Sequence, residues 1–221
     1  MMNPGALPGK GSRTYPSTSV RDTAAMLPKA SSVRRKKTSI PVKPSIGSVV
    51  RYYRDLHSAP DEEFSGPYRL TSLGAWATSR APHVFYFFRK IRLARFRLFL
   101  DLGSGDGIVA CIAGLFTRSV GIEVDPFLCL TGRRATDVLG LTGRVRFICA
   151  DYRFQRIRRA DALYIYPDKP VLPFHELLQD WKGTLLVYGP HFAPDGFEPV
   201  EELRCGPERL RVYRKPKTGG K

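Results

Sequence analysis

Residues 99–125 read FLDLGSGDGIVACIAGLFTRSVGIEVD, and this stretch decides the fold. An apolar strand leads into Asp101, and an apolar segment of helical length leads to a second short strand that ends in Glu123. Between them, three glycines occupy alternate positions: Gly103, Gly105 and Gly107. The pattern predicts a strand, a sharp turn, a helix and a second strand.

The turn has the features of a nucleoside site. Glycine lets the backbone bend sharply and approach a ligand that a Cβ would obstruct. Glu123 follows Gly103 at about the twenty-residue spacing that one helix and one strand require, and an acid there can accept hydrogen bonds from two ribose hydroxyls. The third glycine comes one residue earlier than in the G-x-G-x-x-G loop of dinucleotide sites, and the sequence has no Walker loop. The alternative is a glycine-rich turn with a structural acid.

The G-x-G-x-G turn preceded by Asp101 resembles the first motif of class I S-adenosylmethionine (SAM)-dependent methyltransferases. The resemblance covers about residues 75–215. It implies an α/β fold with a doubly wound, mostly parallel seven-stranded sheet and a C-terminal antiparallel hairpin. It also implies SAM as the cofactor.

Later segments follow the order that such a fold requires. Segments typical of a helix or of strands lie at 126–139, 144–149, 161–166 and 183–188. Two last segments, 198–204 and 209–214, flank a Gly206-Pro207 turn and predict the hairpin. Alternating strands and helices followed by a hairpin favour a mostly parallel sheet with one antiparallel strand.

The resemblance implies a role for each residue that matches a motif position. Asp101 is expected near the methionine amino group, Glu123 at the ribose and Asp151 at the exocyclic amine of adenine. Apolar walls are expected from Ile122, Val124 and Tyr152. The full set of expected cofactor-binding residues is Asp101, Gly103, Ser104, Gly105, Gly107, Glu123, Val124, Asp151 and Tyr152.

Within this family, the short chain with its D-L-G-S-G-D-G and G-I-E segments is similar to small protein-lysine methyltransferases of the archaeal and mitochondrial type. Two elements depart from that group. Thr78 stands without the preceding proline, and 166–170 reads YPDKP in place of [DN]-P-P-[YF]. A protein lysine is the first acceptor expected, RNA the second and a small metabolite the third. A non-catalytic SAM-binding interaction module is the alternative of a different class.

The acceptor pocket is expected at the carboxyl ends of the fourth and fifth strands. Tyr166, Asp168 and His191 fall there and are the candidate catalytic residues. A lysine acceptor must lose a proton before it attacks, and Asp168 or His191 could take it. The alternative is that Asp168 caps the following segment and His191 satisfies a loop hydrogen bond.

Composition is consistent with one enzyme domain. The chain has 221 residues, of which 43% are hydrophobic, enough for a single core. Its four cysteines are far apart and form no C-x-x-C pair, which favours a reducing compartment, here expected to be the cytoplasm, over a disulfide framework or a metal site. The sequence has no uncharged apolar run of about 18 residues, so no membrane span is expected.

Three regions are expected along the chain. Residues 1–45 are predicted to be a disordered basic tail, because residues 1–50 carry a net charge of +8 out of +16 and lack apolar periodicity. Such an arginine- and serine-rich, acid-poor segment is also typical of an organelle-targeting peptide, the alternative location. Residues 46–80 are predicted to be an extension that packs on the domain, with a helix near 49–56 and a loop at 65–73. Residues 81–215 are the predicted methyltransferase domain.

Basic residues also cluster inside the predicted domain. One cluster precedes the first strand of the nucleoside unit, and the other follows Asp151: Arg89, Lys90, Arg92, Arg95 and Arg97, then Arg153, Arg156, Arg158 and Arg159. Such clusters can hold an RNA backbone, attract an acidic protein or form a solvated face. The aromatic run at 84–88 is expected to pack in the core, with base stacking as the alternative. A protein substrate is the expected partner, RNA is the second, and the sequence indicates no oligomeric state.

Overall fold

The structure is a computed structural model that describes residues 43–58, 68–71, 74–167, 181–189, 192, 194 and 198–214, with the backbone alone for residues 68–71 and 74–76. These residues belong to one compact unit of the chain, residues 39–221. The predicted basic tail lies outside the described residues except for its last three positions, 43–45.

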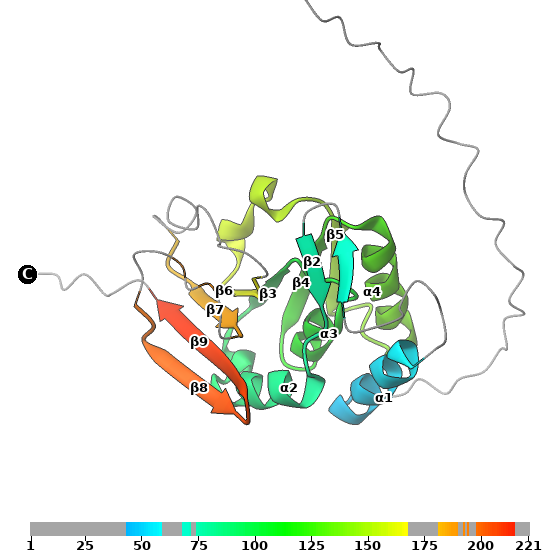
Figure 1. Cartoon of the computed structure of the whole chain (residues 1–221), viewed down its shortest axis with the longest axis horizontal. Coiled ribbons are helices and arrows are strands. Elements are labelled where there is room, and N and C mark those ends of the chain that lie inside the picture. The colour runs from blue at the N-terminus through cyan, green and yellow to red at the C-terminus, as the bar shows by residue number, and fades with distance from the viewer. Residues whose placement is uncertain are drawn as a thin grey trace, which may run out of the picture. The chain divides into compact units, whose positions relative to one another are not determined.

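Seven strands of the described chain form one sheet in the order β5-β4-β3-β6-β7-β9-β8 (Figure 1). Their bounds are β3 Leu98–Leu102, β4 Arg118–Glu123, β5 Val145–Cys149, β6 Ala162–Ile165, β7 Thr184–Tyr188, β8 Glu201–Cys205 and β9 Glu208–Arg214. Strands β3 to β7 run parallel, whereas β9 is antiparallel to both β7 and β8. The predicted fold class and C-terminal hairpin are therefore confirmed.

The described chain also has four α-helices and three 3-10 helices, of which the first three precede the sheet and the others connect its strands. Their bounds are α1 Ile46–His57, α2 Ala81–Lys90, η3 Leu93–Arg95, α3 Ile108–Gly114, α4 Pro126–Val138, η4 Tyr152–Phe154 and η5 Ile157–Arg159. Helix α4 begins where predicted, because Asp125 caps it by accepting hydrogen bonds from the backbone N–H groups of Phe127 and Leu128.

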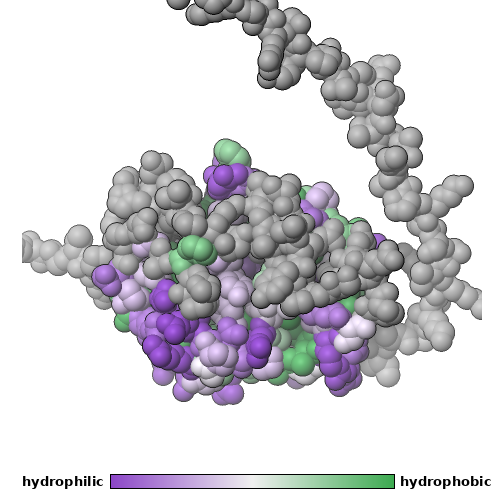
Figure 2. Space-filling view, in the orientation of Figure 1, coloured by the Kyte–Doolittle hydropathy of each residue, from purple (hydrophilic) through white to green (hydrophobic). Residues whose placement is uncertain are grey.

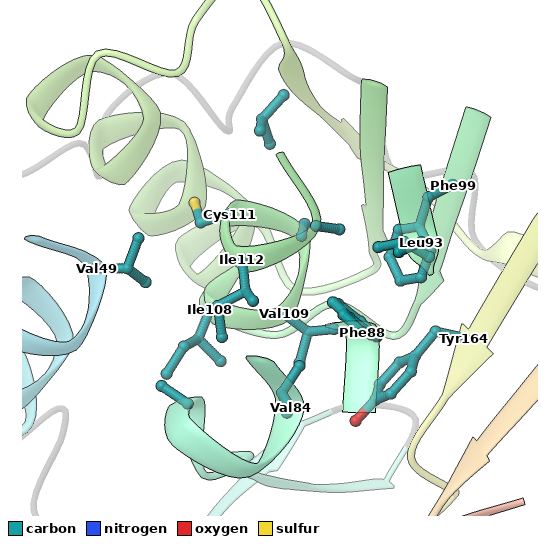
Figure 3. Close-up of a cluster of buried hydrophobic side chains, with 14 of the residues drawn as sticks. Val49, Val84, Phe88, Leu93, Phe99, Ile108, Val109, Cys111, Ile112 and Tyr164 are labelled. Carbon is teal, nitrogen blue, oxygen red and sulfur yellow. The ribbon is translucent and has the colours of Figure 1, made fainter. Parts of the chain in front are cut away.

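The two faces of the sheet build two separate cores. Phe99 of β3 packs in a cluster with buried side chains of the four helices, among them Val84 and Phe88 of α2, and with Tyr164 of β6 (Figure 3). The ring centroid of Phe88 lies 5.2 Å from that of Phe99. The predicted packing of the aromatic run on the sheet is thus confirmed.

The opposite face carries a smaller cluster. Leu100 and Leu102 alternate with Phe99 along β3 and pack there with Ile157 of η5 and with Trp181. The indole nitrogen of Trp181 donates a hydrogen bond to the carbonyl of Ala160 at 2.7 Å, which satisfies its buried polar atom.

The segment before α2 differs from the prediction. Sequence patterns predict a loop at residues 65–73, but Tyr68–Thr71 form strand β1, which pairs antiparallel with β2, Gly74–Ala77. Backbone pairing across a very short connection needs no long run of alternating residues, and aromatic and β-branched residues such as Tyr68 and Thr71 favour extended backbone.

Helix α1 is longer than the predicted 49–56 segment. Ser45 caps its first turn, because its Oγ accepts from the backbone N–H of Ser48 while the Oγ of Ser48 accepts from the backbone N–H of Ser45. Val49 and Tyr53 are its buried residues, and the helix packs against α2 and α3. Within the described ranges, none of the helices has the length and apolar character needed to cross a bilayer.

Candidate functional site

The connection between β3 and α3, residues 103–107, is here called the glycine loop. Its three glycines all adopt positive φ angles, +73° at Gly103, +55° at Gly105 and +89° at Gly107. L-residues with side chains rarely adopt this backbone, which explains the alternating glycines. A Cβ added at Gly103 would meet no atom of the described residues within 4 Å, so these residues leave this side of the loop open to a ligand.

Gly107 is constrained from the opposite side. A Cβ at this position would lie 2.4 Å from the Cζ atom of Phe147 on β5, and Cβ atoms at Gly121 and Gly132 would crowd the same ring. These three glycines form a cradle for Phe147 and hold α3 and α4 close to the sheet. Gly107 therefore has a packing role beyond the cofactor role inferred from its motif.

Glu123 joins the end of β4 to the glycine loop. One carboxylate oxygen accepts a hydrogen bond from the backbone N–H of Gly105 at 2.8 Å, and the other accepts from the N–H of Asp125 at 2.9 Å. The side chain is buried. Each carboxylate oxygen can accept two hydrogen bonds, so Glu123 retains acceptor capacity while it fixes the shape of the loop.

Asp101 places a buried carboxyl group beside this loop. Only 2% of its surface is exposed, and burial, followed by the nearby carboxylate of Glu123, raises the pKa of Asp101 well above its usual range. Among the described residues, neither its Oδ2 atom nor the buried Oγ atom of Ser104 has a hydrogen-bond partner. Unpaired buried acceptors are costly, and a ligand that carries N–H or O–H donors would satisfy them.

Helix α1 holds the tip of the glycine loop through Asp106. The imidazole Nε2 of His57 lies 2.7 Å from Oδ2 of Asp106, a side chain with no exposed surface. The hydroxyl of Tyr53 donates to the backbone carbonyl of Asp106 at 3.0 Å. Two side chains one helical turn apart thus reach the same residue.

Sequence reasoning gave His57 no role. The signal that could have found it is weak: Tyr53 and His57 lie four positions apart, and the motif carries a second acid, Asp106, that no motif role explained. Cys111 lies behind this contact, 3.5 Å from the Tyr53 hydroxyl, and burial raises the pKa of its thiol to about 12. That thiol is therefore protonated at neutral pH and is no nucleophile.

Asp151 follows β5 at the same edge of the sheet. Strands β3, β4 and β5 are neighbours in parallel register, so their carboxyl ends bring Asp101, Glu123 and Asp151 to one edge of the sheet. The Asp151 carboxylate accepts from the backbone N–H of Arg153 and from its guanidinium, with the shortest contact 2.5 Å from Nη2 to Oδ2. Two of the predicted walls, Val124 and Tyr152, are partly buried.

The predicted acceptor side is described only in part. Tyr166 follows β6 and is half-exposed, with its ring 5.0 Å from the ring of Tyr188 in an edge-to-face arrangement. Asp168 and His191 lie outside the described residues, so their roles stay predictions. Across the described ranges, His, Cys, Asp and Glu side chains form no group of three or more that could hold a metal ion.

No protein-family model and no curated protein matches this sequence. Solved structures do match. An RNA methyltransferase of Salinibacter ruber in complex with S-adenosyl-L-homocysteine aligns with a TM-score of 0.56 and 21% identity, over 65% of this chain and 97% of that chain. A hypothetical protein of Thermus thermophilus aligns with a TM-score of 0.51 and 16% identity, over 68% of this chain and 94% of that chain. Together with the strand order and the glycine loop, these likenesses show that the chain has the class I SAM-dependent methyltransferase fold.

Proposed function

We propose that this protein is a SAM-dependent methyltransferase. The observation that carries the proposal is the open, positive-φ turn at Gly103 between two buried acids, with the acceptor atoms Asp101 Oδ2 and Ser104 Oγ unpaired among the described residues. A nucleoside with an attached amino acid offers donors for such atoms. The neighbour from Salinibacter ruber, which was solved with S-adenosyl-L-homocysteine, supports the choice of ligand.

The residues present fit SAM along its length. Glu123 would accept hydrogen bonds from the ribose hydroxyls with the lone pairs that the loop leaves free. Asp101 would face the methionine ammonium group, whose positive charge would bring the carboxyl pKa back down. Asp151 would accept from the adenine amine, between the side chains of Val124 and Tyr152. The roles of Asp101, Glu123 and Asp151 are the ones predicted from the motifs.

When bound, SAM supplies a methyl group on a sulfonium ion, and the chain supplies position and charge. The glycine loop would orient the donor in line with the acceptor and exclude water. Positive charge at sulfur is lost when a neutral amine attacks, so an anion at that sulfur would stabilise the ground state more than the transition state. Carboxylates assigned to the ammonium, ribose and adenine ends are consistent with this requirement.

The acceptor is a finer question. A protein lysine, deprotonated by Asp168 or His191 beside Tyr166, follows from the family layout and stays a prediction, as does a cytoplasmic location. One described feature favours RNA instead, because the chain after Asp151 exposes an aromatic ring among four arginines. A small metabolite and a non-catalytic SAM-binding module are the remaining alternatives.

Calorimetric titration of SAM into the purified full chain tests the proposal. We expect saturable binding by the wild type and none by Gly105→Arg or Glu123→Ala, because the first blocks the loop and the second removes its anchor. Glu202→Gln is the matched control, since Glu202 lies on β8 at the far edge of the sheet and pairs there with Arg204 and Arg211. Absence of wild-type binding would contradict the proposal.

Transfer of labelled methyl from SAM to cell lysate separates an enzyme from a binding module. An enzyme labels at least one fraction, and Glu123→Ala labels none. Binding without any transfer would favour the non-catalytic module.

A further inference from the structure

Residues 152–159, here called the arginine segment, connect β5 to β6 through the two short turns η4 and η5. The sequence is YRFQRIRR, with four basic residues and no acid. All four arginines are exposed: Arg153, Arg156, Arg158 and Arg159. The segment lies in the yellow-green stretch of Figure 1, and Figure 2 shows a projection of mixed hydrophilic and hydrophobic colour at that place.

An aromatic ring stands at the surface of this segment. Phe154 is 82% exposed, more than any other large hydrophobic side chain of the described residues. The guanidinium of Arg153 lies 5.9 Å from its ring centroid. The segment is nevertheless anchored, because Ile157 and Ala160 are buried in the second core. The fold therefore exposes the Phe154 ring to solvent on a segment whose backbone is held by buried residues.

The other basic cluster offers an internal comparison. Arg89 and Arg95 lie near the amino end of β3, away from the carboxyl edge where the cofactor residues converge. Two aromatic rings lie there. Phe96 is partly buried and lies 4.8 Å from the Arg95 guanidinium, and Tyr86 is 37% exposed with the Lys90 ammonium 5.4 Å from its ring centroid. The most exposed ring of that cluster is less than half as exposed as Phe154, and the cluster lies away from the candidate site, whereas the arginine segment presents charge and an outward-facing ring next to that site.

This combination fits a single-stranded nucleic acid. Bases stack on exposed aromatic rings, and arginines neutralise the phosphates on either side. An acidic peptide would pair with the arginines, but its carboxylates would make no favourable contact with the outward-facing phenyl ring. The Asp151 carboxylate, which is assigned to the adenine of SAM, accepts hydrogen bonds from the Arg153 guanidinium. A nucleic-acid strand on this surface would therefore lie beside the methyl donor.

We propose that the arginine segment is the docking surface for single-stranded RNA, with Phe154 as the stacking platform and Arg156 and Arg159 as phosphate contacts. The proposal rests on the proposed methyltransferase function and names RNA as its acceptor. The RNA strand would enter the site from the carboxyl end of β5.

The proposal is tested by fluorescence anisotropy of the full chain with a labelled single-stranded RNA. An RNA of about 12 nucleotides suffices, because one single-strand-binding domain covers about 4 to 16 nucleotides. We expect Phe154→Ala to weaken binding about tenfold, the loss of one stacked base. Arg156→Gln with Arg159→Gln should weaken binding by a similar factor and flatten the salt dependence. The matched control, Arg89→Gln with Arg95→Gln, removes the same charge and should change affinity less than about twofold.

Two results would overturn the proposal. One is wild-type affinity in Phe154→Ala, and the other is equal loss of affinity in the two arginine pairs. A methyl label in lysate that survives ribonuclease, yet is lost in Phe154→Ala, would assign the surface to a protein instead. SAM titration of the same variants separates this inference from the proposed function, because all of them should bind SAM as the wild type does. No SAM binding by any protein would contradict the function, whereas RNA affinity independent of Phe154 would contradict the docking surface alone.

Discussion

The glycine loop and the arginine segment lie at the same edge of the sheet, and each follows a parallel strand, yet they are held in opposite ways. The loop is surrounded by buried carboxyl groups whose bonds fix its shape, from Glu123 to Gly105 and from Asp106 to His57. The segment is anchored by Ile157 and by the following Ala160, and it exposes Phe154 and its four arginines. Substitutions in the loop should therefore lower both the stability of the fold and the affinity for SAM. Substitutions in the segment should lower the affinity for RNA alone.

The largest effect is expected within the glycine loop itself. Gly107→Ala would push a Cβ into the ring of Phe147 at a positive φ, which should lower the free energy of unfolding by about 3 kcal/mol. Gly103→Ala has the same backbone strain but open space around it, so about 1 kcal/mol is expected. Urea unfolding of both variants measures the difference, and equal losses would contradict the assigned packing role.

Next in size is the contact between α1 and the loop. His57→Ala leaves the buried Asp106 carboxylate without its imidazole partner and should cost about 2 kcal/mol. Tyr53→Phe removes one hydrogen bond to the Asp106 carbonyl and should cost about 1 kcal/mol. Thermal unfolding gives both values. SAM affinity unchanged in His57→Ala would show that α1 supports the fold without positioning the loop.

Substitution of Asp101 should raise stability where the two preceding substitutions lower it, and the gain should depend on pH. Its folded-state pKa is raised by burial, so the folded chain holds this proton to higher pH than the unfolded chain and loses stability as pH rises through that window. Asp101→Asn has no such loss. Without SAM, the variant should be more stable than the wild type at about pH 8, and the gap should shrink toward about pH 4, near the ordinary pKa of an unfolded aspartate. Thermal unfolding across this range checks the trend, which a constant gap would contradict.

The smallest effect on stability is expected at Asp151, the residue that precedes the arginine segment. Asp151→Asn weakens the hold on Arg153 at a partly exposed site, so unfolding should change by less than about 0.5 kcal/mol. SAM affinity should fall several-fold, because the neutral amide presents one acceptor oxygen in place of two. Calorimetry gives the SAM affinity, and urea unfolding of the same preparation gives the stability. A stability loss equal to that of His57→Ala would contradict the difference in how the two regions are held.

Local patterns carried much of the fold. The strand at Asp101, the turn at the alternating glycines, the start of α4 at Pro126 and the final hairpin all depend on residues close in sequence, and the structure confirms them. Contacts between distant residues were not accessible in this way. His57 meets Asp106 across 49 positions, and Phe147 meets three glycines from separate elements.

The candidate site divides along the same line. The three acids at the carboxyl edge could be predicted, because each ends a strand with its own apolar pattern. The bonds from Glu123 to the Gly105 N–H and from Asp151 to Arg153 could not, because they depend on how the loops close.

A crystal structure of the full chain with S-adenosyl-L-homocysteine tests the central claim most directly. The account predicts the nucleoside at the open side of Gly103, with Glu123 within hydrogen-bond distance of the ribose hydroxyls while it keeps its bonds to the N–H groups of Gly105 and Asp125. A ligand bound elsewhere, or a Glu123 that makes no ribose contact, would contradict it.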